Sequence, residues 1–321
     1  MHIQADTLDD LMRVVFSAIR EKGEKVVPSK GANTELFGVV LELNKPLARV
    51  SRTERKGKLY SALGELLWYL AGSNDFAFIK YYIPKRGYES DDGGKTVWGA
   101  YGPRLFSMRG GINQIDQVRA LLSNPDRQSS RKAVIQLFNA EDISEHHSDV
   151  PCTCTLQFFV RKTGLDMFVS MRSNDAYKGL PHDIFAFTMI QELLARDLGQ
   201  PVGRYKHAAG SLHLYDEDEK DTDEFLDEAW QDVVEMPAMP DGAPWKALEI
   251  LKNVEARIRG GEEIDINALE IDGYWKDLCR LLQVHALARG MAAKKNRDKV
   301  EAISKAMSSD FFRPYINARK K

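Results

Sequence analysis

The segment between residues 151 and 183 combines residue types that can form a covalent bond, hold an anion and read a hydrogen-bond pattern. Cys152 supplies a thiol, whose thiolate form attacks electrophilic carbon. Arg172, followed by Ser173, supplies a guanidinium that binds phosphate oxygens in bidentate fashion. A guanidinium also favours the charged form of a neighbouring thiol, so we expect Arg172 to lower the pKa of Cys152. The alternative for a lone cysteine in a strand-rich segment is a small buried packing residue.

A predicted β-hairpin places these two side chains next to each other. Residues 155–160 and 165–171 alternate in apolar character, which predicts two strands, and Lys162-Thr163-Gly164 between them is typical of a tight turn. Cys152 precedes the first strand and Arg172 follows the second. Folding of the hairpin therefore brings the thiol and the guanidinium together.

These residues belong to an ordered set of motifs that resembles the thymidylate synthase family. The family's pattern is Pro-Cys-His, then Gln-Arg-Ser-x-Asp, then Gly-Leu-Pro-Phe-Asn. This chain has Pro-Cys-Thr, Met-Arg-Ser-Asn-Asp and Gly-Leu-Pro-His-Asp at the matching spacing. Further motifs in the family's order are Glu-Leu-Leu-Trp-Tyr-Leu-Ala-Gly at 65–72, Tyr101-Gly102, Ser130-Arg131-Lys132 and His213-Leu214-Tyr215.

The resemblance implies an α+β fold, with a mixed β-sheet covered by helices in a single domain over 1–321. Its family-like core runs from about 37 to 215. It also implies a homodimer in which two sheets pack back to back, 5,10-methylenetetrahydrofolate as co-substrate, and no metal. Residues 245–321 depart most from the family, and their pattern predicts a helical C-terminal extension.

The resemblance also implies roles for individual residues. In the family, the cysteine adds to C6 of a pyrimidine and makes C5 a nucleophile for the folate methylene group. This role falls on Cys152, and that of a general base acting through water falls on Glu65. Binding of the phosphate is assigned to Arg172 and Ser173, with Arg131 and Lys132 reaching the same phosphate from the partner subunit. The other implied assignments are Tyr101 for the water network near Cys152, Asn174 and Asp175 for the pterin or base, His213 and Tyr215 for the sugar hydroxyls, Lys30 for a missing phosphate arginine, and Glu65, Trp68, Asp175 and Gly179 for folate.

Each of these assignments has a simpler alternative. Taken alone, Glu65 is a surface acid on a helix, His213 is a core histidine with its hydrogen bonds satisfied, and Arg131 is half of a surface basic pair. The run 63–70 around Glu65 is otherwise apolar, which makes a solvated position a poor fit.

Asp183 is the departure that bears most on function. Thymidylate synthases carry asparagine here, whose amide donates to O4 of uracil and accepts from N3–H. An ionised carboxylate only accepts, so Asp183 suits the amino group of cytosine. A protonated carboxyl also donates, to N3 of cytosine, and would be needed to accept uracil. The aspartate resembles that of the cytidylate 5-hydroxymethylases of the same superfamily. Because 181–198 predicts a helix, the alternative is that Asp183 only starts that helix.

Two further departures concern the sugar and the fate of the methylene group. Ala176 replaces a larger apolar residue and leaves room for a ribose 2′-hydroxyl, and Lys132 replaces the family's second arginine. Together they resemble the CMP hydroxymethylases of nucleoside-antibiotic biosynthesis, with ordinary variation of the pocket wall as the alternative. Residues 317–321 are basic where the family has a short apolar tail that excludes water, which favours hydroxymethylation over methylation.

These expectations combine into CMP 5-hydroxymethylation, with dCMP hydroxymethylation as the first alternative. The others are thymidylate synthesis and a non-catalytic cytidylate-binding protein. Retention of Cys152 and Glu65 speaks against the binding protein, because binding needs neither.

Composition is typical of a cytoplasmic enzyme. A formal charge of −2 over 321 residues, without an aromatic and basic stripe, argues against a nucleic-acid partner. The three cysteines lack the spacing of zinc ligands. No apolar run approaches the ~18 residues of a membrane span, and 7–22 predicts an amphipathic helix, not a signal peptide.

The remaining elements follow from periodicity and turn residues. Strands are predicted at 38–43, 133–138 and 204–214, helices at 58–71 and 273–289, and loops at 216–227 and 236–242.

Overall fold

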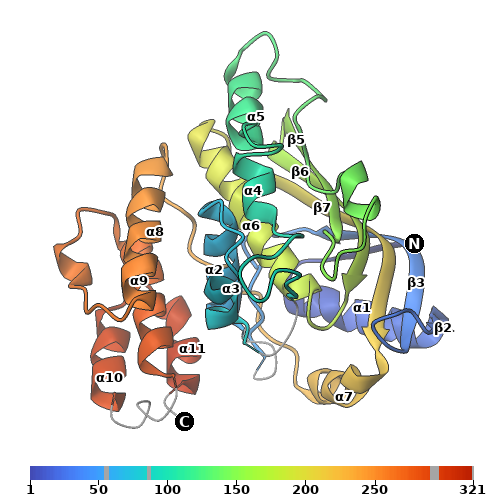
Figure 1. Ribbon diagram of the computed structural model, residues 1–321. Coiled ribbons are helices and arrows are strands. Elements are labelled where there is room, and N and C mark those ends of the chain that lie inside the picture. The colour runs from blue at the N-terminus through green and yellow to red at the C-terminus, as the bar shows by residue number, and fades with distance from the viewer. Residues whose placement is uncertain (54–57, 85–87, 290–295, 320–321) are drawn as a thin grey trace.

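The chain forms one mixed β-sheet with helices, and a computed structural model describes residues 1–53, 58–84, 88–289 and 296–319 (Figure 1). The strands are β1 (His2–Ala5), β2 (Glu24–Val26), β3 (Asn33–Leu43), β4 (Val134–Gln136), β5 (Thr153–Arg161), β6 (Gly164–Asp175) and β7 (Val202–Tyr215). The α-helices are α1 (Leu8–Lys22), α2 (Leu59–Leu70), α3 (Phe76–Tyr82), α4 (Tyr101–Phe106), α5 (Gln114–Ser123), α6 (Leu180–Asp197), α7 (Glu219–Asp227), α8 (Trp245–Arg259), α9 (Gly273–Leu287), α10 (Arg297–Ala306) and α11 (Arg313–Ala318). Short 3-10 helices are η1 (Ala140–Ile143), η2 (Asp216–Asp218), η3 (Ile266–Ala268) and η5 (Asp310–Phe312).

The sheet has the order β1-β3-β7-β6-β5-β4, with β2 added beside β3. The pairs β1–β3 and β6–β7 are parallel and the other pairs are antiparallel, which confirms the expected mixed sheet. The predicted hairpin is present, because Arg161 pairs with Gly164 across a two-residue turn. Gly164 has a φ of 116°, and a Cβ there would lie 2.2 Å from the Pro201 carbonyl oxygen. Only glycine fits this turn without strain.

One face of the sheet is buried and the other is open. Residues that pair directly across neighbouring strands share a face. The paired row Leu41, His207, Val169, Leu156 and Ile135 is fully buried. The adjacent row Glu42, Lys206, Phe168, Gln157 and Val134, on the opposite face, is half-buried or exposed.

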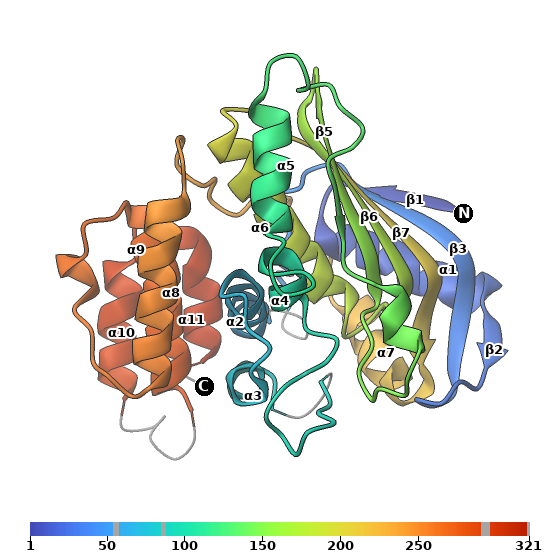
Figure 2. The ribbon, with the colours of Figure 1, turned by 45° about the horizontal axis from the view of Figure 1, so that its top comes forward.

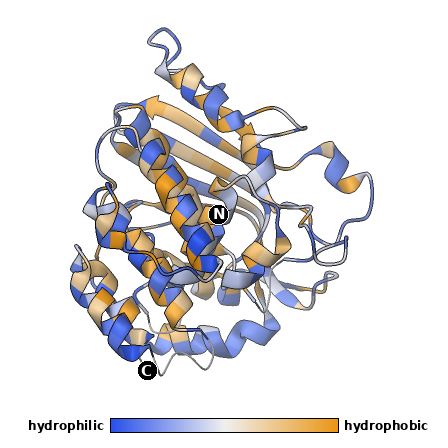
Figure 3. Ribbon diagram, turned by 60° about the vertical axis from the view of Figure 1, so that its left-hand side comes forward, coloured by the Kyte–Doolittle hydropathy of each residue, from blue (hydrophilic) through white to orange (hydrophobic). Residues whose placement is uncertain are grey.

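Helices α1 and α6 cover the buried face. Leu8 of α1 and Phe185 of α6 line the same pocket, so both helices lie on one side of the sheet. The Thr7 side chain caps α1 by accepting a hydrogen bond from the Asp10 backbone N–H at 3.1 Å, as the predicted helix start requires. Figure 3 shows hydrophobic and hydrophilic residues side by side along the helices, as expected of elements that cover a core on one side.

The C-terminal helices α8–α11 form a bundle on the far side of α2 and α3 from the sheet (Figure 2). The Tyr82 hydroxyl of α3 donates to Glu255 Oε1 of α8 at 2.8 Å. The Tyr315 hydroxyl of α11 donates to the Ser51 carbonyl oxygen at 3.0 Å. Of the basic ending, the guanidinium of Arg319 lies 4.8 Å from the Tyr60 ring centroid, and 320–321 lie outside the described residues.

One predicted loop is wrong. Residues 216–227 form η2 followed by α7, although the segment is strongly acidic. Thr222 and Phe225 are fully buried, and the Phe225 ring packs against Phe16 of α1 with centroids 5.4 Å apart. Packing of this apolar pair stabilises a helix that the charged composition of the segment does not predict. The predicted strand at 133–138 is also shorter in the structure, where β4 covers three residues.

Candidate active site

Cys152 is half-buried in the turn that enters β5, and Arg172 lies near the end of β6. The structure brings them together, with Arg172 Nη2 3.7 Å from Cys152 Sγ. Arg172 Nε donates to the Pro151 carbonyl oxygen at 2.9 Å, and Nη2 donates to that of Val150 at 3.0 Å. The guanidinium therefore also anchors the loop that carries the thiol.

The expected net lowering of the Cys152 pKa is wrong, although Arg172 acts in the expected direction. Burial raises the pKa of the Cys152 thiol, and the charges of Asp183 and Asp149 raise it further. Arg172 and Lys30 act in the predicted direction but do not outweigh burial. Burial therefore favours the thiol form of Cys152, an effect that sequence reasoning did not count beside the guanidinium.

Asp183 lies in the first turn of α6 and is 9% exposed. Its Oδ2 accepts a hydrogen bond from Asn174 Nδ2 at 2.6 Å. Burial, together with the charge of Glu65, raises the pKa of Asp183 well above its ordinary value, more than Asn174 lowers it. The site therefore favours the protonated carboxyl, which presents one donor and one acceptor.

Glu65 of α2 lies at the centre of a buried hydrogen-bonded cluster. Tyr69 donates to its Oε1 at 2.7 Å, Tyr88 donates to the same oxygen, and His182 Nδ1 contacts Oε2. Burial acts to raise the pKa of Glu65, but His182 and the two tyrosines outweigh it, so the pKa is lowered. An ionised carboxylate inside the protein is the form that a general base needs.

Sequence reasoning misses the three partners of Glu65. His182 replaces the phenylalanine of the family's Gly-Leu-Pro-Phe-Asn pattern, so a titratable residue beside Asp183 was the available signal. Tyr69 follows Glu65 by four residues, on the same face of α2. Tyr88 follows α3 in a segment without a motif, and no sequence signal points to it.

Tyr101 begins α4 and lies between the thiol and the Glu65 cluster. Its hydroxyl accepts hydrogen bonds from the Thr153 backbone N–H at 3.1 Å and from Thr153 Oγ1 at 2.9 Å. Its ring centroid lies 4.9 Å from that of Tyr69. Tyr101 therefore holds the residue that follows Cys152, and its role in a water network stays a prediction.

The turn between β6 and α6 carries three predicted site residues. Asp175 Oδ1 accepts hydrogen bonds from two backbone N–H groups of the turn, at 2.8 and 2.9 Å. Gly179 is the N-cap of α6, where a Cβ would lie 3.2 Å from the Asp175 carbonyl oxygen. Ala176 is fully buried, and its backbone N–H donates to the His213 carbonyl oxygen at 2.8 Å. The small side chain thus lies next to the expected sugar-binding strand.

The expected sugar and phosphate residues are distributed over β7 and β6. Burial lowers the pKa of His213, which pairs in register with Asp175. The rings of His213 and Tyr215 meet edge-on with centroids 5.0 Å apart. Ser173 pairs in register with Ser211. Among these described residues, polar groups from both parallel strands reach the same end of the sheet.

Three predicted site residues do not join this group: Arg131 and Lys132 lie away from it, and Trp68 is buried. Arg131 and Lys132 are exposed beside the middle of β5, where the Arg131 carbonyl oxygen accepts from Gln157 Nε2 at 2.9 Å. Gln157 lies five residues from Cys152, roughly 16 Å along an extended strand. Trp68 is fully buried and donates to the Asp75 carbonyl oxygen, so the geometry gives its folate role no support.

Lys30 lies near the site but is already engaged. Its ammonium group is 3.7 Å from Glu89 Oε1, and its charge acts on both Cys152 and Asp149. Burial raises the pKa of Asp149 to about 6. The role of Lys30 as a substitute for the missing phosphate arginine therefore stays a prediction.

Within the described ranges, no group of three or more histidine, cysteine, aspartate or glutamate residues has the arrangement of metal ligands. No helix in the described part of the chain is long and apolar enough to cross a membrane.

Comparison with known proteins agrees with this geometry. Residues 11–259 match the family model described as thymidylate synthase. The chain is similar to the deoxyuridylate hydroxymethyltransferase of Bacillus phage SP01, with 32% identity over 219 residues. The aligned part covers 64% of this chain and 56% of the phage protein, so the chain spans about half the length of that relative.

Proposed function

The chain belongs to the thymidylate synthase family, and we propose that it hydroxymethylates C5 of CMP, with 5,10-methylenetetrahydrofolate as the one-carbon donor. The observation that carries this proposal is the grouping of Cys152, Asp183 and Glu65, in which the charge of Asp183 acts on Cys152 and that of Glu65 acts on Asp183. The family typically acts on a nucleotide and a folate as a dimer.

Cys152 starts the proposed reaction by losing its proton and bonding through sulfur to C6 of the ring. C5 then bonds to the methylene carbon of the donor as one of that carbon's two bonds to nitrogen breaks, and the released nitrogen takes up a proton. Glu65 removes the C5 proton through water. Tetrahydrofolate leaves with the electron pair of the remaining carbon–nitrogen bond and a proton. Water bonds to the exposed methylene carbon and gives up one proton, and Cys152 leaves C6. The products are the 5-hydroxymethyl nucleotide and tetrahydrofolate, without oxidation of the folate.

Support for a cytosine base comes from Asp183. Its protonated carboxyl can donate to N3 and accept from the 4-amino group, which matches the cytosine edge. Asn174 carries a second buried acceptor, since its Oδ1 has no hydrogen-bond partner within the described residues. A buried polar site of this kind discriminates strongly between bases.

A uracil base is the second candidate, and two observations favour it. The phage relative is named for deoxyuridylate. A protonated Asp183 can also accept from N3–H of uracil and donate to O4, so the protonation state that burial favours fits both bases. The proposal of cytidylate therefore depends on the aspartate in place of the family's asparagine.

Support for a ribose substrate is narrower. Ala176 leaves space beside the strand that carries His213, and Lys132 replaces the family's second arginine. dCMP is the alternative to CMP at this point.

We infer a homodimer from the open sheet face. That face carries half-buried Phe168 and Val40, and Phe37, three residues before Val40 on β3, is 89% exposed. A second copy packed against it would bury these side chains and bring the partner's Arg131 and Lys132 toward Arg172.

Product analysis tests the proposal. The pure protein is incubated with 5,10-methylenetetrahydrofolate and, separately, CMP, dCMP and dUMP, and the nucleotide and folate are identified by mass spectrometry. Gain of CH₂O on CMP with release of tetrahydrofolate is the expected result. The same gain only on dCMP or dUMP retains the reaction but overturns the sugar or base assignment. Methylated dUMP with dihydrofolate indicates thymidylate synthesis, and no product with any nucleotide overturns the enzymatic proposal.

A further inference from the structure

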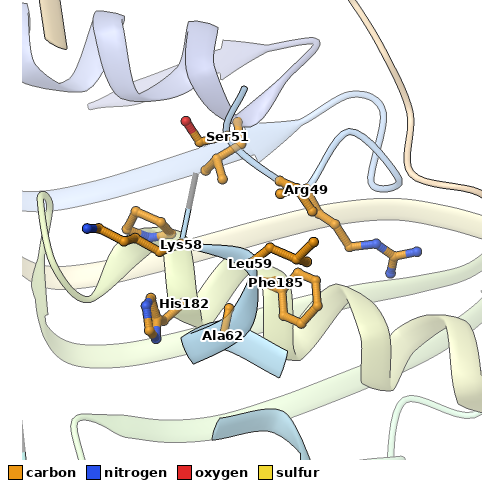
Figure 4. A pocket seen from close by; sticks show the side chains of 10 residues that line it. Arg49, Ser51, Lys58, Leu59, Ala62, His182 and Phe185 are labelled. Carbon is orange, nitrogen blue, oxygen red and sulfur yellow. The ribbon is translucent and has the colours of Figure 1, made fainter. Parts of the chain in front are cut away.

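His182 contacts Glu65 from the first turn of α6, at a position where the family pattern has phenylalanine. Its Nδ1 faces Glu65 Oε2, and its Nε2 lies 3.3 Å from Ser61 Oγ on α2. The side chain of His182 is 16% exposed and that of Glu65 is 8% exposed. Figure 4 shows the imidazole beside Ala62, among the residues that line a small pocket.

The hydrogen bonds around Ser61 determine which atoms of His182 carry protons. Ser61 Oγ donates its single hydrogen to the Lys58 carbonyl oxygen at 3.0 Å. It must therefore accept from His182 Nε2–H. Nδ1 contacts Glu65 Oε2, so the ring also donates a hydrogen bond to the carboxylate, which stays the acceptor.

The two tyrosines of the cluster occupy one oxygen of the Glu65 carboxylate. Tyr69 and Tyr88 both donate to Oε1, so Oε2 alone has a lone pair left for a water molecule. The orientation of that lone pair depends on His182. Among the described residues, the titratable or charged side chains that face this carboxylate are His182 and Asp183 from α6, Tyr69 from α2 and Tyr88 from the segment after α3, with Tyr101 of α4 packed against Tyr69.

We propose that His182 is a positioning residue that keeps Glu65 ionised and aims its free lone pair at the water that adds to the methylene group. This inference rests on the proposed function for the identity of the water. It explains why a polar ring stands at the phenylalanine position, since phenylalanine would leave the buried carboxylate with two tyrosine donors among the described residues. A buried carboxylate with fewer donors takes up a proton more readily and is a weaker base.

The first test needs no substrate. Glutamate carboxyl carbons are labelled with ¹³C, and the Glu65 signal is identified by its loss in Glu65→Gln and followed from pH 5 to pH 9. In the wild type the Glu65 carbon is expected to stay ionised over this range. In His182→Phe it is expected to titrate within it, and in His182→Asn, which keeps one donor, at a lower pH than in His182→Phe. A Glu65 signal that titrates identically in all three proteins overturns the proposal, whatever the enzyme acts on.

The second test uses turnover, once a nucleotide substrate is in hand. We expect His182→Phe to lower kcat about tenfold at pH 6 and to recover toward alkaline pH, with the Kd for nucleotide unchanged. His182→Asn is expected to lie between the two. Phe185→Leu, one turn further along α6 in the same pocket, is the packing control and is expected to keep the wild-type pH profile. An equal loss at all pH values in both His182 variants overturns the proposal and indicates a packing role.

Discussion

Arg172 acts on Cys152 through its charge, and removal of that charge should make the thiol less reactive. In the structure the guanidinium Nη2 lies 3.7 Å from Sγ and stabilises the thiolate. Arg172→Gln keeps a polar side chain of similar length but removes the positive charge. The thiol of Cys152, whose pKa burial already raises, then loses its nearest stabilising charge.

The size of the effect follows from Coulomb's law. Two unit charges separated by 3.7 Å interact by about 1 kcal/mol in water and by about 4.5 kcal/mol at an effective dielectric constant of ~20. Arg172 is exposed and Cys152 is half-buried, so solvent screens the pair and the lower end applies, about 1–2 kcal/mol. The thiolate fraction at a fixed pH below the thiol pKa should therefore fall roughly tenfold.

Alkylation by iodoacetamide measures this fraction directly. The rate at Cys152 is followed by peptide mass spectrometry in the nucleotide-free protein, from pH 6 to pH 10. We expect roughly tenfold slower alkylation of Arg172→Gln at neutral pH, with the rates converging at alkaline pH. Arg172→Lys, which keeps the charge, should lie within about threefold of the wild type. Faster alkylation of Arg172→Gln would refute the electrostatic reasoning, because it would mean that release of the Val150–Pro151 loop matters more than the charge.

Three other changes have defined outcomes. Asp183→Asn should move the base preference toward uracil. The stability of this variant relative to the wild type should improve as pH rises, because the raised pKa of Asp183 means that ionisation of the wild-type carboxyl opposes folding. A thermal-melting difference that is constant from pH 5 to pH 9 would contradict this. Subunits carrying Arg131→Ala and Lys132→Ala, mixed with Cys152→Ala subunits, should regain about a quarter of the wild-type activity through hybrid dimers; no gain on mixing argues against a shared site. Burial lowers the pKa of His285 from 6.5 to about 4, so stability should fall by about 3 kcal/mol as pH drops through that window. His285→Gln should remove this loss, as measured by urea unfolding at pH 4.5 and pH 7.

The central sheet could be predicted because its signals are local. Alternation over 155–160 and 165–171, with a turn between them, defines the β5–β6 hairpin, and the long amphipathic pattern at 181–198 defines α6. The helix α7 could not be predicted, since its stability comes from Phe225 packing against distant Phe16 and its own composition is typical of a loop.

Some features of the candidate site could likewise be predicted from the sequence and others could not. Cys152, Arg172 and Asp183 could be found from residue type and spacing, and the structure places them at one end of the sheet. The protonation states could not, because they depend on burial: desolvation outweighs the effect of Arg172 on the thiol and favours a proton on Asp183. The contact of Tyr88 with Glu65 also escapes sequence reasoning, because a loop without a motif carries the tyrosine.

The contacts of the C-terminal bundle affect the order in which the chain can mature during synthesis. The Ser51 carbonyl oxygen, just before α2, accepts a hydrogen bond from the Tyr315 hydroxyl. The ring of Tyr60 in α2 lies against Arg319. Both partners come more than 250 residues later in the chain. A ribosome releases residues in order, so α2 and its Glu65 are made long before these contacts exist. The sheet can form early, while the helix that carries the proposed base reaches its final surroundings only when α11 docks. Translation pauses or chaperones that act late in synthesis would therefore affect activity more than they affect the core fold.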